Sequence, residues 1–273
     1  RQCQRLAKQG WMQGIVNRTP RGPPVMPHSV DIVIPTLNEA HALPRSLPIV
    51  HSFLIEHLSE YRWNLLVADN GSTDGTADVA RDLSAQLPAI SVIELTRAGR
   101  GHALSTAWLQ SDADFLSYMD VDLSSELSVL PELLKQLVSG WDIAVGSRHL
   151  STSQVRRSLR RSILSQGYNF TARKVLGIRF SDAQCGIKAI TAPAARDLLP
   201  RVRNGGWFFD TELLALAETL GYRIAELPVR WTEDPDSRVR LLPTVLEDLA
   251  GLGRLRLRDL PAARSTQRNK ALR

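Results

Sequence analysis

The stretch SDADFLSYMDVDLSSE, residues 111–126, holds a short apolar run with an Asp-x-Asp triplet on each side. Asp112 and Asp114 precede the run FLSYM, and Asp120 and Asp122 follow it. A short apolar run of this kind predicts a buried β-strand. Carboxylates one residue apart are suited to a divalent cation, so the direction of this strand decides which triplet can meet a ligand.

Outward from this run, short apolar runs alternate with segments of helical spacing over residues 30–147. Strands that alternate with helices of this length indicate an α/β fold, with a mostly parallel central sheet and helices on both faces. The predicted strands are residues 30–35, 63–69, 90–95, 115–122 and 141–147, and the predicted helices are residues 40–58, 73–87, 101–110 and 125–139.

Beyond residue 147 the alternation is less regular, although strands and helices still follow one another. Residues 154–176 form a strongly basic stretch that is expected to be amphipathic. We further expect a helix at residues 192–199, a strand end followed by a helix in residues 205–221, a strand at residues 222–231, and a helical segment from Leu241.

The composition is that of a globular protein with a positive charge. Of the 273 residues, 43% are hydrophobic and 23% charged, which are ordinary values. The net charge of +6 favours anionic partners. Aromatic residues make up only 6%, which argues against a module that binds nucleic acid by stacking bases. Two cysteines make a structural disulfide improbable, and Cys185 is expected to be a small core residue.

In parallel α/β sheets, ligands bind outside the carboxyl ends of the strands. Asp112 and Asp114 enter their strand and so belong to the opposite edge, where we expect solvated turn carboxylates. Asp120 and Asp122 leave it at the ligand edge. Polar residues after the other strands are expected at this same edge: Thr36, Asn38, Glu39, Asp69, Asn70 and the segment from Arg97 to Arg100.

Four motifs in the first half resemble family 2 glycosyltransferases of the GT-A fold. They are VIPTLNE (33–39), VADNGSTDGT (67–76), AGRGHAL (98–104) and MDVD (119–122). Arg100 stands where the family has Lys, and Ser124 where many relatives have Gln, so a third metal ligand stays unassigned. The resemblance implies a nucleotide-sugar site made of Pro35, Thr36, Asn38, Glu39, Asp69, Asn70, Arg100, Asp120, Val121 and Asp122.

The second half resembles the polyprenyl- or dolichyl-phosphate glycosyltransferases. The motifs are AVGSR (144–148), RSILSQGYN (161–169), DAQCGIKA (182–189), FFDTELL (208–214) and ELPVRWTEDPDSRV (226–239). The resemblance implies that Asp122, Arg148, Arg161 and Asp182 serve catalysis. It also implies an acceptor-phosphate site made of Arg148, Arg161, Gln184, Lys188 and Arg238.

Together these features predict an inverting hexosyltransferase that uses Mg²⁺ or Mn²⁺ held by Asp120 and Asp122. A lipid phosphate is largely a dianion near neutral pH and attacks without a general base. Two alternatives stay open. One is a hydroxyl acceptor, which requires a base such as Asp182, Asp210 or Glu212. The other is a module that binds nucleotides without turnover.

The expected domains are a polar N-terminal extension (1–28), a GT-A catalytic domain (29–240) and a basic amphipathic C-terminal segment with its tail (241–273). The resemblance implies a polyprenyl or dolichyl phosphate as acceptor, and through CGIKA (185–189) and ELPVRW (226–231) it favours UDP-glucose as donor, with GDP-mannose next. The basic stretches 154–176 and 241–258 suit an anionic membrane surface. No apolar run approaches the roughly 20 residues that span a bilayer. We therefore expect a peripheral protein on the cytoplasmic face of a membrane.

Overall fold

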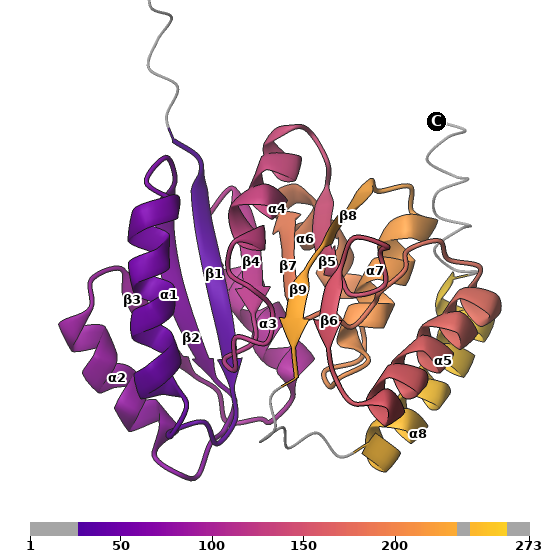
Figure 1. The fold of residues 1–273 in the computed structure, drawn as a ribbon, viewed down its shortest axis with the longest axis horizontal. Helices are drawn as coiled ribbons and strands as arrows, with labels where there is room; N and C mark the ends of the chain where they lie inside the picture. The colour runs from indigo at the N-terminus through magenta and orange to yellow at the C-terminus, as the bar shows by residue number, and fades with distance from the viewer. Residues whose placement is uncertain (1–26, 234–240, 261–273) are drawn as a thin grey trace, which may run out of the picture.

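The computed structural model describes residues 27–233 and 241–260, which form one twisted sheet covered by helices on both faces (Figure 1). The seven strands lie in the order β3-β2-β1-β4-β7-β5-β8. This confirms the predicted α/β fold with a mostly parallel sheet. The strands are β1 (Ser29–Thr36), β2 (Arg62–Asp69), β3 (Ile90–Glu94), β4 (Phe115–Met119), β5 (Ile143–Ser147), β7 (Ile187–Thr191) and β8 (Ile224–Pro228).

The helices separate into two layers because each packs an apolar stripe against one face of the sheet. One core cluster joins the sheet to α1 (Leu43–His57), α2 (Thr76–Gln86) and α4 (Val129–Val138). The other joins it to α3 (Arg100–Gln110), α5 (Leu159–Leu176), α6 (Ala192–Leu198), α7 (Phe209–Thr219) and α8 (Leu241–Arg254). All five residues of β4 and of β5 are buried, as expected for strands covered on both faces.

One strand of the sheet, β7, runs antiparallel to both of its neighbours, β4 and β5. Strand β7 therefore begins at the edge where β4 and β5 end. The segment DAQCG, which precedes β7, is brought beside the residues that follow β4, and the Asp120 amide donates to the Gly186 carbonyl at 3.1 Å. A parallel β7 would have carried Asp182 to the far edge.

Two of the predicted elements differ in the structure. The strand expected at residues 222–231 is divided into β8 and a separate β9 (Arg230–Thr232). Strand β9 pairs with β6 (Gln154–Arg156) in a second, two-stranded sheet, so the chain leaves the large sheet at Pro228. The strand end expected at the start of residues 205–221 is wrong, because residues 202–208 are irregular or turn before α7 begins.

The described part of the C-terminal segment shares the core of the domain. Leu252, Leu255 and Leu260 are buried in the same cluster as α7. Helices α5 and α8 lie side by side at one end of the molecule (Figure 1). None of the helices within the described ranges is long and apolar enough to cross a membrane.

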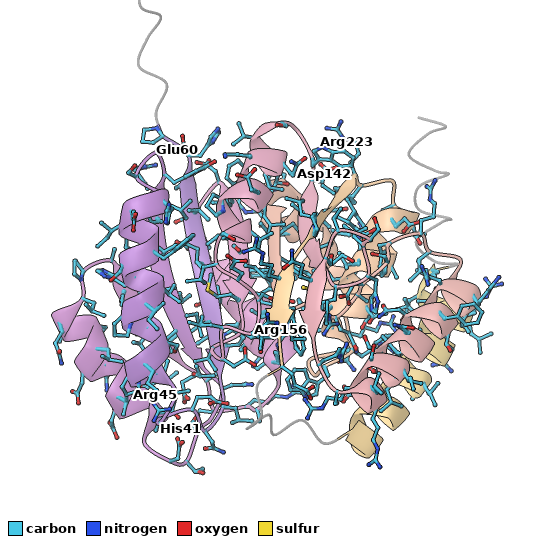
Figure 2. All side chains as sticks on the ribbon, in the orientation of Figure 1. His41, Arg45, Glu60, Asp142, Arg156 and Arg223 are labelled. Atoms are coloured by element: carbon cyan, nitrogen blue, oxygen red, sulfur yellow. The ribbon has the colours of Figure 1, made fainter. Side chains whose placement is uncertain are left out.

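The strands give the sheet two chemically distinct edges, and we call the edge where β1, β2, β4, β5 and β8 end the C-terminal edge. In Figure 2, His41 and Arg45 mark this edge, and Glu60, Asp142 and Arg223 mark the opposite one. At the end of β1 and β2 the register pairs Thr36 with Asp69. Polar residues that follow different strands are therefore collected along one line.

Candidate active site

The two Asp-x-Asp triplets lie at opposite edges of the sheet, as the direction of β4 predicted. Asp114 accepts hydrogen bonds from the backbone and hydroxyl of Ser29, both at 2.9 Å, where β1 begins. Asp112 is exposed at that same edge. Asp120 and Asp122 follow β4 at the C-terminal edge, so only the second triplet can meet the predicted ligand residues.

The ends of β1 and β2 and the loops that follow them, residues 36–40 and 69–76, are bonded to each other, and we call these two segments the β1–β2 loops. The Asn38 amide donates to the Ser72 hydroxyl at 2.8 Å, and the Thr73 amide donates to the Asn38 side-chain oxygen at 2.8 Å. The Glu39 amide donates to the Thr76 hydroxyl at 2.8 Å. Asn38 has a φ of 57°, a conformation that Asn tolerates better than most residues. These bonds fix the loops without using every polar group.

Two buried oxygens in the β1–β2 loops have no hydrogen-bond partner among the described residues. They are the Oδ1 atoms of Asp69 and Asn70, whose residues are only 4% and 3% exposed. The other carboxylate oxygen of Asp69 accepts from the Ser72 amide at 3.2 Å. A buried acceptor without a partner costs about 1 to 3 kcal/mol. Each of these two oxygens can therefore accept a hydrogen bond from an N–H or O–H group outside the described residues.

Asp120 belongs to a network of buried charges beside the β1–β2 loops. One of its oxygens accepts from the Arg100 guanidinium at 2.8 Å, and Arg100 also bonds Asp210 at 2.5 Å. The other oxygen lies so close to Gly186 that a β-carbon there would stand 1.9 Å from it. Glycine at position 186 is thus required for Asp120 to occupy this place. Arg100, predicted to lie near a diphosphate, reaches this edge but holds the two carboxylates.

Lys188 is part of the same network, and its predicted role at the acceptor phosphate needs correction. Its ammonium donates to the Tyr118 hydroxyl, to the Cys185 carbonyl and to Asp210 at 2.8 to 2.9 Å. The residue is 1% exposed. An ammonium has three N–H groups, and all three are used inside the protein. Lys188 therefore fixes Asp210 rather than offering charge to a ligand.

Asp122 is the exposed carboxylate of the site. Its Oδ1 accepts from the Ser124 amide at 2.9 Å, which orients the side chain at the turn after β4. Val121, between the two carboxylates, is buried in the apolar cluster that contains α1 and α4. Within the described residues, no three His, Cys, Asp or Glu side chains are grouped to hold a metal. Two carboxylates fit a hard cation that takes its other ligands from phosphates and water.

Further along the C-terminal edge, after β5, Arg148 and Asp182 form a bidentate pair. The Nε and Nη2 atoms of Arg148 donate to the two carboxylate oxygens at 2.7 and 2.9 Å, and the Arg148 amide adds a third bond at 3.0 Å. Burial alone would raise the pKa of Asp182, but the Arg148 guanidinium outweighs burial and holds the pKa well below its usual range. Asp182 therefore orients Arg148 and is a poor general base.

Arg161 lies at the start of α5 and forms an ion pair with Glu233, with a nitrogen–oxygen distance of 3.0 Å. Glu233 also accepts from the Ser158 amide at 2.6 Å, which ties the end of β9 to the start of α5. Glu233 was not predicted as a site residue. Arg238, which was predicted at the acceptor phosphate, lies outside the described residues.

The other candidate bases of a hydroxyl-acceptor mechanism are also held by cations. Burial raises the pKa of Asp210, but Lys188 and then Arg100 reverse the effect, so the pKa is lowered. Glu212 is fully buried and accepts from the Arg254 guanidinium at 2.7 and 3.0 Å. Asp182, Asp210 and Glu212 are each committed to internal pairs, which disfavours all three as proton acceptors.

Two residues near the predicted acceptor site were not found from the sequence. Asp248, on α8, is buried and accepts from the Gln184 side chain at 3.1 Å. Burial raises the pKa of Asp248 to about 6. Arg157 stacks on Trp231, with 5.2 Å between the guanidinium and the ring centre. Arg157 was visible in the run RRSLRR, but no local signal separated it from its neighbours.

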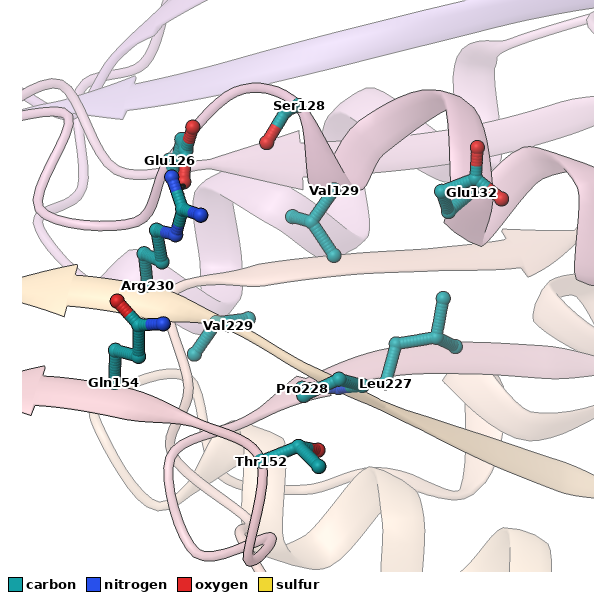
Figure 3. A pocket seen from close by; sticks show the side chains of 10 residues that line it. All are labelled: Glu126, Ser128, Val129, Glu132, Thr152, Gln154, Leu227, Pro228, Val229 and Arg230. Carbon is teal, nitrogen blue, oxygen red and sulfur yellow. Dashed lines mark ion pairs between the residues drawn. The ribbon is translucent and has the colours of Figure 1, made fainter.

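A cavity of about 400 Å³ lies beside α4, away from these groups (Figure 3). Glu126 and Arg230 lie together at one side of it and form an ion pair, with a nitrogen–oxygen distance of 3.6 Å. None of the residues that line it belongs to the predicted site. The candidate site is therefore an open edge of the sheet and not this cavity.

Comparison with known proteins gives the site its context. A family model described as "Glycosyl transferase family 2" matches residues 31–199. The chain is 34% identical over 226 residues to Glycosyltransferase AglD of Haloferax volcanii, with 82% of this chain and 36% of that protein covered. It is 31% identical over 222 residues to Dolichyl-phosphate beta-glucosyltransferase ALG5C of Trichomonas vaginalis, with 77% of this chain and 65% of that protein covered. The chain thus spans about one third and two thirds of these relatives.

A solved structure shares the architecture at lower sequence identity. It is glucosyl-3-phosphoglycerate synthase from Mycobacterium tuberculosis, in complex with Mn²⁺, uridine diphosphate and glucosyl-3-phosphoglycerate. The TM-score is 0.57 with 20% sequence identity, and the match covers 87% of this chain and 80% of that one. The likeness extends over most of the described sheet and its helices.

Proposed function

The chain belongs to glycosyl transferase family 2 and has the GT-A fold, and from this premise we propose that it transfers a hexose from a nucleotide-diphosphate sugar to a polyprenyl or dolichyl phosphate. UDP-glucose is the favoured donor, with GDP-mannose next. The relatives named as dolichyl-phosphate beta-glucosyltransferases support glucose and a lipid phosphate. Members of the family transfer glycosyl groups, and what we propose for this chain is the identity of the donor and the acceptor.

One observation carries the proposal, namely the order of polar groups along the C-terminal edge. Buried acceptors without partners stand in the β1–β2 loops, the carboxylates Asp120 and Asp122 follow β4, and arginines stand beyond β5. A nucleotide sugar presents N–H and O–H groups at the nucleoside and a diphosphate in the middle. A phosphate acceptor beyond the sugar then meets the arginines.

The β1–β2 loops are proposed to hold the nucleoside. Asp69 and Asn70 would accept from its base and ribose, together with Glu39 from the loop after β1. Pro35, Thr36 and Asn38, with the backbone at Val121, complete the surface proposed for the nucleotide. A hydrogen bond to a charged acceptor contributes about 1.5 to 3 kcal/mol, so Asp69 is expected to dominate.

Asp122 and Asp120 would hold Mg²⁺ or Mn²⁺, with Asp122 as the first ligand. Asp122 is exposed to solvent, whereas Asp120 is partly buried and is paired with the cation of Arg100. Such a cation supplies positive charge to the leaving diphosphate. Arg100 keeps Asp120 in place and adds its own charge near the same point.

Arg148 and Arg161 would bind the acceptor phosphate, and Asp182 and Gln184 would position them. A phosphate dianion needs orientation and relief from repulsion by the donor diphosphate, which guanidinium groups provide. It needs no proton acceptor, in agreement with the pairing of Asp182, Asp210 and Glu212 to cations. Attack on the anomeric carbon from the opposite side inverts its configuration, so an α-linked donor gives a β-linked product.

The lipid acceptor places the enzyme at a membrane surface, and we propose that α5 makes this contact. Leu159, Ile163 and Phe170 are exposed on α5 at spacings of four and seven residues, so they share one face. Arg160 and Lys174 lie on the same helix. Exposed apolar side chains flanked by cations suit the interface of an anionic membrane. The leaflet and the compartment remain predictions.

A panel of donors and acceptors tests the proposal. UDP-glucose, UDP-galactose and GDP-mannose are supplied with a short polyprenyl phosphate or with the polyprenol of equal length, with Mn²⁺, Mg²⁺ or a chelator. We expect β-linked transfer from UDP-glucose to the phosphate, and loss of activity with the chelator. Transfer to the alcohol but not to the phosphate would contradict the proposed acceptor.

A further inference from the structure

The guanidinium groups of two arginines make cation–π contacts with the ring of Trp231. Arg148 lies 5.6 Å and Arg157 lies 5.2 Å from the ring centre. Trp231 is held in β9 by its pairing with Val155 of β6, two residues before Arg157. The small sheet of β6 and β9 thus sets Arg157 and Arg148 against a common indole.

The charges around this indole do not balance. Arg148 is paired with Asp182, and Arg161 is paired with Glu233. No carboxylate pairs with Arg157 within the parts of the chain that the structure describes. The Nε atom of Arg157 is buried and has no hydrogen-bond partner there. We call Arg148, Arg157 and Arg161 the arginine cluster, in which two carboxylates face three guanidinium groups.

Arg157 is held in place against repulsion. Burial lowers the pKa of Arg157, and Arg148 lowers it further; Asp182 and Glu233 act in the opposite direction, and Arg161 adds a smaller lowering. A half-buried guanidinium with an unbonded N–H costs free energy unless an anion satisfies it. This unfavourable arrangement lies near both Arg148 and Arg161, the two residues predicted to contact the acceptor phosphate.

We propose that Arg157 is a third contact to the acceptor phosphate, placed between Arg148 and Arg161. The inference rests on the proposed function, because it names a further group at the same acceptor site. Its ligand class is a phosphate monoester of a polyprenol. Two nitrogens of Arg148 donate to Asp182, which leaves Arg148 with fewer N–H groups for a phosphate. Arg157 would supply the additional N–H donors. Trp231 acts as a positioning residue that fixes the planes of both guanidinium groups.

The test compares Arg157→Gln and Arg157→Lys with Arg196→Gln. Arg196 is exposed on α6 and belongs neither to the proposed site nor to the proposed membrane contact. Binding of a short water-soluble polyprenyl phosphate is measured calorimetrically without donor, and the KM values for donor and lipid are measured separately. Loss of a charge-assisted hydrogen bond is worth about 10- to 100-fold in affinity. We expect Arg157→Gln to weaken lipid phosphate binding by that factor, with the donor KM changed less than about twofold.

The controls separate the possible failures. Arg157→Lys keeps the charge on one ammonium and is expected to recover part of the affinity, and Arg196→Gln is expected to bind as the unaltered protein does. Equal binding by Arg157→Gln and the unaltered protein would overturn the inference. So would an equal loss of affinity for the uncharged polyprenol, because that indicates a purely structural role. A phosphate affinity that depends on Arg157, with sugar transfer only to hydroxyl acceptors, would remove the proposed function and leave the anion site standing.

Discussion

At the β1–β2 end of the C-terminal edge, Asp69 and Asn70 each keep a buried oxygen without a partner in the described chain. At the β5 end, both oxygens of Asp182 are bonded by Arg148, and the buried atoms without a partner in the described chain are the Arg157 Nε and the Asp248 Oδ1. The first end thus presents only acceptors without partners, whereas the second also presents a guanidinium N–H without one. An enzyme that holds a nucleoside at one end and a phosphate at the other needs this polarity.

The β1–β2 loops and the buried charges beside them also differ in how they tolerate change. The β1–β2 loops hold their form through bonds between neighbouring short loops, so their orphaned oxygens can be altered without unfolding the sheet. Arg100 and Lys188 are buried cations that both pair with the buried carboxylate of Asp210, so each charge is neutralised by the others. We therefore expect variants of the first kind to change kinetics, and variants of the second kind to change stability.

The largest expected effect lies between the two ends, at Asp122. Asp122→Ala removes the exposed carboxylate proposed as first metal ligand, and loss of several kcal/mol of charge stabilisation lowers kcat/KM by about 1000-fold. Asp112→Ala, at the opposite edge, is the matched control and is expected to stay within about twofold of normal, as is usual for exposed sites. Steady-state rates at saturating Mn²⁺ measure both. Equal losses would show that the ligand edge has been misplaced.

Asp210→Ala is expected to give the largest loss of stability. It leaves Arg100 and Lys188 buried without their shared carboxylate, and breaking a buried pair costs about 3 to 5 kcal/mol. Urea unfolding followed by circular dichroism gives the change in the free energy of unfolding. Asp78→Ala, which breaks an exposed pair with Arg81, provides the control and is expected to change little. If the two variants unfold at the same urea concentration, the buried network does not hold the site together.

The two ends were not equally readable from the sequence. Thr36, Asp69 and Asp120 end or directly follow predicted strands, so periodicity and strand direction located them. The buried arginine–carboxylate pairs instead join distant segments of the chain. Arg100 and Asp210 are 110 positions apart, and Arg148 and Asp182 are 34 apart. The local sequence pattern does not show which arginine pairs with which carboxylate, because the chain has many arginines in similar local contexts.

Lys188 is a second case in which the sequence did not predict the contacts of a side chain. The motif that contains it lies at the C-terminal edge, because the antiparallel β7 starts there. Its ammonium nevertheless turns inward to Tyr118 and Asp210. Which side of a strand a residue faces depends on its register with β4, which the sequence alone did not supply.

A kinetic variant at the β1–β2 end sharpens the comparison. Asp69→Ala removes the charged acceptor and is expected to raise the donor KM about 10- to 100-fold. Asn70→Ala removes a neutral acceptor and is expected to raise it about 3- to 10-fold. The KM for the lipid phosphate in the same variants is the internal control and is expected to hold. A rise in the lipid KM instead would place these loops at the acceptor.

The smallest effect is expected at Asp248, which lies beside Gln184 at the arginine end. The carboxyl has an ordinary pKa of about 3.9 when unfolded, and burial raises it to about 6 in the fold. Protonated Asp248 thus favours the folded state below about pH 4, and this contribution is lost as the pH rises through about 6. Asp248→Asn keeps an oxygen for Gln184 and cannot ionise. Thermal unfolding at pH 4.5 and pH 7.5 is expected to show the variant gaining about 1 to 2 kcal/mol relative to the unaltered protein at the higher pH. A difference that does not change with pH would mean that Asp248 stays ionised in the fold, and that the arginine end holds one more anion than its buried pairs indicate.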